Sequence, residues 1–228
     1  MKKIIALAAL VFAAGLAFAQ EDAAPAEEKP EKFDLEVTVG FPIHWTNADH
    51  RDSGLFYEDK TVTANTALGL SLLFNFTRKL GFTLDTDFFF GGKIMGFASN
   101  NSNYNSLFGA NVLLGPVIYL YNGNFLRIPL AFGAHLYYFS DDLWEPAIAG
   151  DGDWIKRQDL QIGPGAYLGI QFHFNKNIYI FSRTSVAVDV FRWYKANTTI
   201  AGSSNSDTDI EFAFGWTVTP VIGIGVKF

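Results

Sequence analysis

The stretch that ends the chain, residues 210–228, reads IEFAFGWTVTPVIGIGVKF, and its apolar side chains fall on every second position. All the even positions from Ile210 to Phe228 are apolar, whereas the odd positions are mostly small, hydroxylated or charged. Residues 33–45 alternate in the same way, with apolar residues on every odd position. An unbroken alternation over these seventeen positions arises by chance on the order of once in 10⁵. Because successive side chains of a strand point to opposite faces, both stretches are predicted to be β-strands with one apolar face.

The same alternation predicts six further strands, each with its apolar face on the even positions: 61–76, 80–91, 107–121, 125–139, 159–174 and 178–193. The connections then alternate in length. Short ones are expected at 77–79, 122–124 and 175–177, and long ones at about 46–60, 92–106, 140–158 and 194–209. Short turns at one end, long loops at the other and an even strand number are typical of outer-membrane barrels. The predicted fold class is therefore all-β: an eight-stranded antiparallel up-and-down transmembrane β-barrel.

The composition of the two strand faces indicates which one contacts lipid and which one lines the interior of the barrel. A soluble eight-stranded barrel places its apolar face inside and a polar face in water. Here one face is almost wholly apolar and the other mixes charges, amides, hydroxyls and glycines, so we expect the apolar face to lie against lipid. All thirteen glycines of the predicted strands fall on the inward parity, which suits a narrow lumen. Five prolines within these strands must each lie at a bulge, a strand end or a gap in the ladder: Pro42, Pro116, Pro129, Pro164 and Pro220.

The start of the chain predicts export. Lys2 and Lys3 precede an apolar run over 4–18 and the sequence Ala-Phe-Ala at 17–19, which favours a cleaved signal peptide over residues 1–19. The competing interpretation, a membrane anchor, needs roughly 20 apolar residues. An acidic periplasmic leader is expected over 20–32 and the barrel over 33–228.

Charge and cysteine content exclude several classes of protein. Cleavage removes Lys2 and Lys3 from the 17 basic residues, so 15 face 23 acidic ones and the net charge is about −8. That balance argues against nucleic acid as a partner. The chain has no cysteine, which excludes a disulfide scaffold and a lipid anchor on cysteine.

The signal peptide, the eight alternating strands and the terminal run Ile222, Ile224, Val226 and Phe228 resemble the small outer-membrane barrels typified by the OmpA transmembrane domain, OmpX and the OmpW group. The resemblance covers the chain from about residue 33 to the end. It implies a monomer surrounded by outer-membrane lipid in a diderm bacterium. It also implies biogenesis through periplasmic chaperones and the barrel-assembly machinery, which would read the terminal strand with Phe228. The acidic stretch 21–31 and the lack of a periplasmic domain after the last strand depart from the OmpA pattern.

Charged residues of the inward parity predict an ionic network across the lumen, because buried charges must pair or reach water. We expect Asp85 or Asp87 to face Arg183 at mid-height, and Lys227 to lie near Asp34 and Glu36. The candidate network is Asp85, Asp87, Arg127, Arg183, Asp189, Glu211 and Lys227. It can fill the interior or form a cation-selective path. We favour a plug, because seven aromatic residues also point inward: Phe89, Tyr119, Tyr137, Tyr167, Tyr179, Phe181 and Phe191.

Catalysis is not expected. Three histidines, His44, His135 and His173, have the inward parity and His50 lies in a loop, so no lipid-facing histidine can activate a nucleophile. No two histidines have metal-ligand spacing on one strand face, and we predict no cofactor. Trp144 and Trp154 in the third loop are candidates for contact with a surface ligand, or they lie at the membrane interface.

Three functions follow in order of preference. The first is a structural, surface-exposed barrel. The second is a narrow channel or lateral-exit conduit for small solutes, including hydrophobic ones, as the resemblance to the OmpW group implies. The third is a lipid-modifying enzyme.

Overall fold

The computed structural model describes residues 33–52, 55–90, 93–96, 103–144, 154–200, 203–212 and 214–228. The predicted signal peptide and leader lie outside these residues. Within the described ranges, no helix is both long and apolar enough to cross a membrane.

Eight barrel strands are built from thirteen strand segments within the described ranges, because five of the eight strands are interrupted once. The interrupted strands are formed by β1 with β2, β3 with β4, β5 with β6, β10 with β11, and β12 with β13. The segments are β1 (Phe33–Gly40), β2 (Ile43–Asp52), β3 (Leu55–Ala64), β4 (Ala67–Asn75), β5 (Leu80–Phe90), β6 (Lys93–Gly96), β7 (Asn103–Asn122), β8 (Leu126–Trp144), β9 (Trp154–His173), β10 (Ile178–Asp189), β11 (Phe191–Ile200), β12 (Ser203–Glu211) and β13 (Phe214–Lys227).

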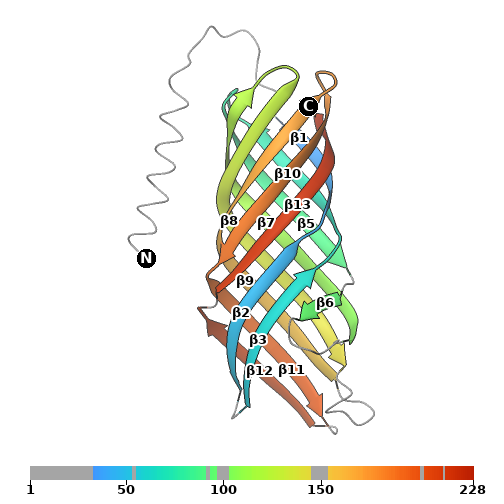
Figure 1. Ribbon diagram of the computed structural model, residues 1–228, viewed down its shortest axis with the longest axis vertical. Helices are drawn as coiled ribbons and strands as arrows, with labels where there is room; N and C mark the ends of the chain where they lie inside the picture. Colours follow the sequence, from blue (N-terminus) through green and yellow to red (C-terminus); the bar gives the residue numbers. More distant parts are fainter. Residues whose placement is uncertain are drawn as a thin grey trace.

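The sheet closes on itself near the C-terminus. β1 pairs antiparallel with β4 on one side and with β13 on the other, so that Asp34 lies opposite Lys227. The ring runs β1, β4, β5, β7, β8, β9, β10, β13 and back to β1. Short turns cap this end, at the top of Figure 1. The predicted eight-stranded antiparallel barrel is confirmed.

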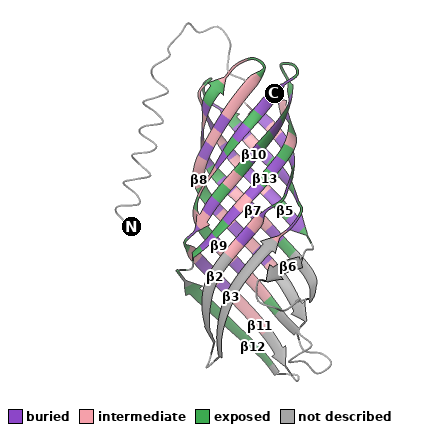
Figure 2. Cartoon of the chain, in the orientation of Figure 1, coloured by how far each residue is buried: buried purple, intermediate pink, exposed green. Residues whose placement is uncertain are grey.

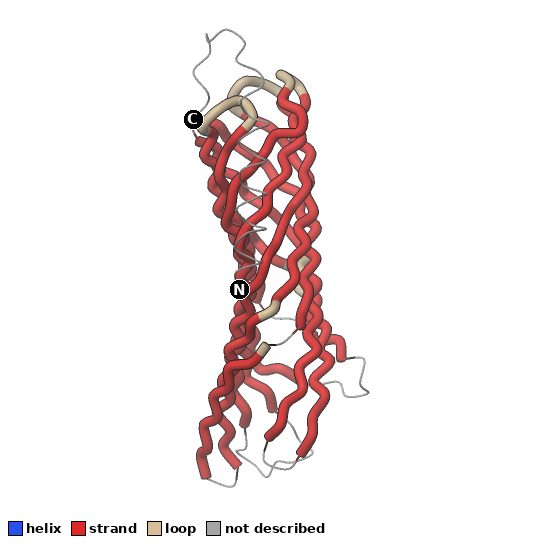
Figure 3. Tube along the Cα trace, turned by 90° about the vertical axis from the view of Figure 1, so that its left-hand side faces the viewer, coloured by secondary structure: helices blue, strands red, loops and turns tan. Residues whose placement is uncertain are grey.

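At the opposite end the strands continue as hairpins beyond the closed ring (Figure 3). Among the described residues, β12 pairs only with β11 and β6 pairs only with β3. The long loops predicted at 46–60 and 194–209 are thus largely wrong, since β2, β3, β11 and β12 extend into them. These hairpins project past the apolar band, so they lack the one-sided apolar alternation by which the strands were predicted.

Burial alternates along each strand of the closed ring, as the diagonal bands of Figure 2 show. In β4 the small residues Ala67 and Ser71 are fully buried, whereas Leu68 and Leu70 are 62% and 50% exposed. The exposed side chains are apolar and the buried ones are mostly polar or small, which is the reverse of a soluble barrel. The apolar face therefore lies outside, as predicted.

The five strand prolines each lie at a break in one hydrogen-bonded ladder. Pro42 separates β1 from β2, and the pairing of β13 with those two strands skips Pro220. The other three lie at gaps between β7 and β8, between β8 and β9, and between β9 and the β10–β11 strand: Pro116, Pro129 and Pro164. Proline cannot donate to a ladder, so these breaks confirm the expectation.

One irregularity changes which side chains face the lumen. Val190 separates β10 from β11, and beyond it the inward parity moves from odd to even residues. Arg192 and Tyr194 are buried, whereas Phe191 is only half-buried. The predicted inward position of Phe191 is wrong because an extra residue at the break rotates the following strand by one face.

Candidate functional site

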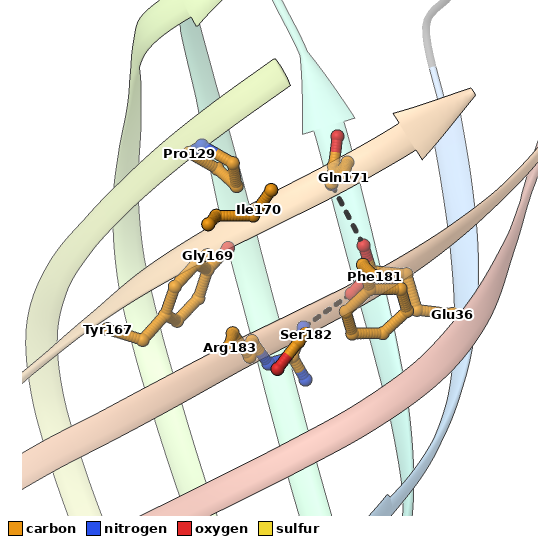
Figure 4. A pocket seen from close by; sticks show the side chains of 9 residues that line it. All are labelled: Glu36, Pro129, Tyr167, Gly169, Ile170, Gln171, Phe181, Ser182 and Arg183. Atoms are coloured by element: carbon orange, nitrogen blue, oxygen red, sulfur yellow. Dashed lines mark hydrogen bonds and ion pairs between the residues drawn. The ribbon is translucent and has the colours of Figure 1, made fainter. Parts of the chain in front are cut away.

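The turn-side half of the lumen is organised around the guanidinium of Arg183 on β10. Its Nη1 pairs with Glu36 of β1, and its Nη2 pairs with Asp85 of β5 and lies 2.5 Å from Ser71 Oγ of β4. Gln171 of β9 donates from Nε2 to Glu36 Oε1 at 3.2 Å. Figure 4 shows Gln171 and Arg183 converging on Glu36 from neighbouring strands. One cation thus links four barrel strands, two of which carry its carboxylate partners.

This cluster crosses the barrel. β10 and β5 are four places apart in the ring of eight, so the pair between Arg183 and Asp85 joins opposite walls. The Arg183 guanidinium carbon lies 5.1 Å from the ring centroids of both Tyr167 and Phe181. A crevice beside it, lined in part by Pro129, Gly169 and Phe181, is too tight for a water molecule. Side chains from opposite walls therefore meet at this height.

Towards the turns, the ring of polar contacts continues from Glu36. The Tyr179 hydroxyl lies 2.7 Å from Glu36 Oε1 and 3.2 Å from Asp34 Oδ2. Lys227 lies opposite Asp34 in the ladder and its Nζ is 5.6 Å from the Tyr179 ring centroid. The last strand thus places its lysine beside Asp34 of the first strand, and this lysine is 4% exposed.

The other half of the lumen is organised around Asp189, which also lies on β10. His135 Nδ1 lies 2.8 Å from Asp189 Oδ1, and the His135 Nε2 is bonded to Asn111. His44 of β2 lies 2.7 Å from Thr217 Oγ1 through its Nδ1. The Asp189 carboxylate is thus contacted by the histidines His135 and His44 and by the Thr217 hydroxyl.

A stacked pair crosses the barrel at the same level. The rings of His44 and Tyr137 lie 3.8 Å apart with an angle of 12° between their planes. β2 continues β1, and β1 and β8 lie on opposite walls, so the two rings meet across the interior. Phe89 packs on the same tyrosine at 5.6 Å between centroids.

The sequence missed one ion pair because of the irregularity at Val190. Arg192 Nε donates to Asp159 Oδ2 at 2.6 Å, and both residues are buried. Asp159 has the expected inward parity, but Arg192 reaches it only because β11 is rotated by one face. The sequence offered one sign of this rotation: Arg192 is charged but stands at an even position, where the preceding strand has only lipid-facing residues.

Other predicted residues have different environments. Asp87 is buried and accepts a hydrogen bond from Thr38 at 3.1 Å. Arg127 is half-buried and lies opposite Gln171 in the ladder near the turns. Three further side chains lie outside the described residues, although their backbones end β12, end β8 and begin β9: Glu211, Trp144 and Trp154.

The even-numbered residues at the end of β13, and Phe228 directly after it, lie on the lipid-facing side. Ile222, Ile224 and Phe228 are exposed, and Val226 is half-buried on the same face. No group of histidines and acids suited to hold a metal ion occurs in the part of the chain that the structure describes.

No protein-family model matches the chain, and no curated protein matches it. Solved structures do. The outer membrane protein OprG from Pseudomonas aeruginosa matches with a TM-score of 0.58 at 17% identity, over 86% of this chain and 97% of that one. The outer membrane protein AlkL, determined in lipid bilayers, matches with a TM-score of 0.54 at 13% identity, over 92% and 97%.

A major outer membrane protein from Thermus thermophilus matches with a TM-score of 0.52 at 15% identity, over 86% of this chain and 99% of that one. At these identities the likeness concerns the fold. It agrees with the closed eight-stranded ring, the apolar exterior and the polar interior. The chain therefore has the fold of the small eight-stranded β-barrels of bacterial outer membranes.

Proposed function

We propose that the protein is a structural, surface-presenting barrel whose polar lumen is closed by its own side chains. The carrying observation is the Arg183 cluster, which joins opposite walls and leaves no room for water beside it. The stacked His44 and Tyr137 rings close the interior a second time. An eight-stranded barrel is just wide enough for side chains, so two such bridges are sufficient to close it.

The hairpins beyond the ring are the part offered to the exterior. Residues 204–210 of β12 are all exposed and include Asp207 and Asp209. A closed barrel can serve as a rigid support for such acidic segments. Trp144 and Trp154 stay candidates for ligand contact in this proposal.

A liposome-swelling assay with small sugars and amino acids tests the closed lumen. Proteoliposomes that contain the folded protein should swell no faster than liposomes without protein. Swelling that depends on solute size would contradict the proposal and favour the narrow channel.

The second candidate, a lateral-exit conduit, is favoured by the proline gaps in the wall. The ladder between β8 and β9 omits Ile128 and Pro129 on one strand and Gly169 and Ile170 on the other. The crevice beside Arg183 is lined by Pro129 and Gly169 at this gap. A solute could leave the lumen sideways there only if the gap opened.

A crosslink separates the two candidates. Pro129→Cys and Gly169→Cys would place two thiols across the gap, and their oxidation would hold it closed. Uptake of a hydrophobic fluorescent solute into proteoliposomes should be absent before and after oxidation in the first proposal. Uptake that is lost on oxidation and regained on reduction would support the conduit.

We also propose that the barrel acts without catalysis. All three histidines whose side chains are described, His44, His135 and His173, are buried in the lumen and none faces lipid. Mass spectra of lipid A from cells that overproduce the protein should equal those of control cells. A new acylated or deacylated species would revive the lipid-modifying enzyme.

A further inference from the structure

We propose that the outer face of β9 and β11 carries a binding site for the phosphorylated headgroup of an outer-leaflet lipid, formed by Lys156 and Lys195. This site does not depend on whether the lumen is open. Among strand lysines and arginines with described side chains, only these two lie on the outer face. The others have the inward parity: Arg127, Arg157, Arg183, Arg192 and Lys227.

The ladder between β9 and β11 brings the two lysines together. Lys195 lies opposite Gln158, and Lys156 lies opposite Asn197, two residues further along. Diagonal neighbours of this kind lie about 7–8 Å apart on one face of a sheet, so both ammonium groups can reach one phosphate. The amides of Gln158 and Asn197 lie on the same face and add hydrogen-bond donors.

The irregularity at Val190 creates this arrangement. With the odd parity of β10 continued, Lys195 would point into the lumen. The rotation of β11 instead turns Trp193 and Lys195 outward while Arg192 and Tyr194 are buried inside. The proposed site therefore exists only in the observed register.

The height of the lysines matches the headgroup region. Outward side chains of β9 are all apolar from Phe172 to Leu160. Twelve residues at about 3.3 Å each, tilted by about 40°, rise about 30 Å, which is enough to cross the apolar band. Trp193 lies opposite Leu160, where an interfacial aromatic girdle is expected, and Lys195 follows it on the same face.

The charges nearby favour an anionic lipid as the occupant. Lys195 has neutral neighbours in both ladders, Gln158 on β9 and Thr208 on β12. Asp207 and Asp209 of β12 have the opposite parity and so belong to the inner face. Lys156 lies opposite Asp142 in the other ladder, which leaves the pair with a net positive charge.

Although the chain has a net charge of −6, the two outward strand lysines whose side chains are described lie directly above the apolar band. A soluble polyanion would approach from the hairpin tips. A lipid phosphate lies at the level of the lysines, and each lysine close to an anionic membrane surface contributes about 1 kcal/mol.

The test compares two doubly substituted barrels with the unmodified chain. Lys156→Gln with Lys195→Gln removes the site, and Lys79→Gln with Lys176→Gln removes equal charge from the turns. Each folded barrel, checked by heat-modifiable migration, is titrated in detergent micelles with diphosphoryl lipid A, and retained lipid is counted by native mass spectrometry. The unmodified chain and the turn variant should retain the lipid, and the site variant should bind it about fivefold more weakly for each lysine lost.

Two further arms make the assignment specific. Lys156→Arg with Lys195→Arg should retain binding, and lipid A stripped of both phosphates should bind no better to the unmodified chain than to the site variant. Equal retention of diphosphoryl lipid A by the site variant and the unmodified chain would overturn the proposal. A parallel titration with a soluble sulfated polysaccharide is the last arm. A site variant that loses binding of this polysaccharide but retains the lipid would also overturn the proposal.

Discussion

The two halves of the lumen are closed by different chemistry. Near the turns, the permanent cation of Arg183 holds two buried carboxylates from other strands. Towards the hairpins, Asp189 is held by His135 and the Thr217 hydroxyl, and the rings of His44 and Tyr137 stack across the interior. Removing one partner of a buried ion pair leaves an uncompensated charge, whereas removing one neutral donor leaves a smaller defect. We therefore expect the Arg183 cluster to be less tolerant of substitution than the surroundings of Asp189. The hairpin-side half has its own buried ion pair, Arg192 with Asp159, further from the turns.

The largest effect is expected for Arg183→Gln. Glu36 and Asp85 would stay buried without their cation, and the unfolding free energy should fall by about 3–5 kcal/mol. Urea unfolding of the refolded barrel in lipid vesicles, followed by tryptophan fluorescence, measures this change.

A neutral network provides the control. Arg183→Gln combined with Glu36→Gln and Asp85→Asn removes all three charges and should regain most of the lost stability. A single variant as stable as the unmodified chain would show that this ion cluster does not hold the barrel together.

Gly225→Leu should have the next largest effect. A side chain at this position would collide with the ring of Tyr179, which lies directly opposite in the ladder. Overpacking of this kind costs about 2–3 kcal/mol. Combining it with Tyr179→Ala should recover part of that loss in the same unfolding assay, and strictly additive costs would refute the collision.

Asp189→Asn should be milder. The amide keeps the shape but loses the charge-assisted bond to His135, at a cost of about 1–2 kcal/mol. The ratio of this loss to that of Arg183→Gln measures the difference between the two halves directly. Equal losses would mean that the histidine-lined half is as dependent on charge as the other.

The smallest effect on stability is expected from single cysteines that test the rotation of β11. Trp193→Cys should react with a membrane-soluble maleimide, whereas Tyr194→Cys should be protected inside the folded barrel. The opposite result would place the strand in the register that simple alternation predicts.

Sequence alternation was sufficient for the closed ring because each strand there has one face in lipid and one in the lumen. It also predicted correctly that Asp85 faces Arg183 and that Lys227 lies beside Asp34, because no bulge interrupts the alternation between these residues and the rest of their strands. The pair of Arg192 and Asp159 could not be predicted in this way. Residues 190–194 are apolar or aromatic on both parities, apart from Arg192, so the alternation does not reveal where the face changes.

The strands of the hairpins could not be predicted from the alternation either. Segments such as 204–210 project past the apolar band with both faces exposed and mostly polar, so no apolar period marks them as strands. Breaks in the ladders, by contrast, were predictable, because proline excludes a backbone donor wherever it stands.

Planar-bilayer recording of the refolded protein tests the closed lumen most directly. We expect a folded, heat-modifiable barrel with no channel openings above those of the bare bilayer. A variant with both bridges trimmed, by Arg183→Ser, Glu36→Ser and Tyr137→Ala, should open measurable channels and serve as the positive control. Reproducible, ion-selective openings of the unmodified protein would contradict a lumen closed by its own side chains.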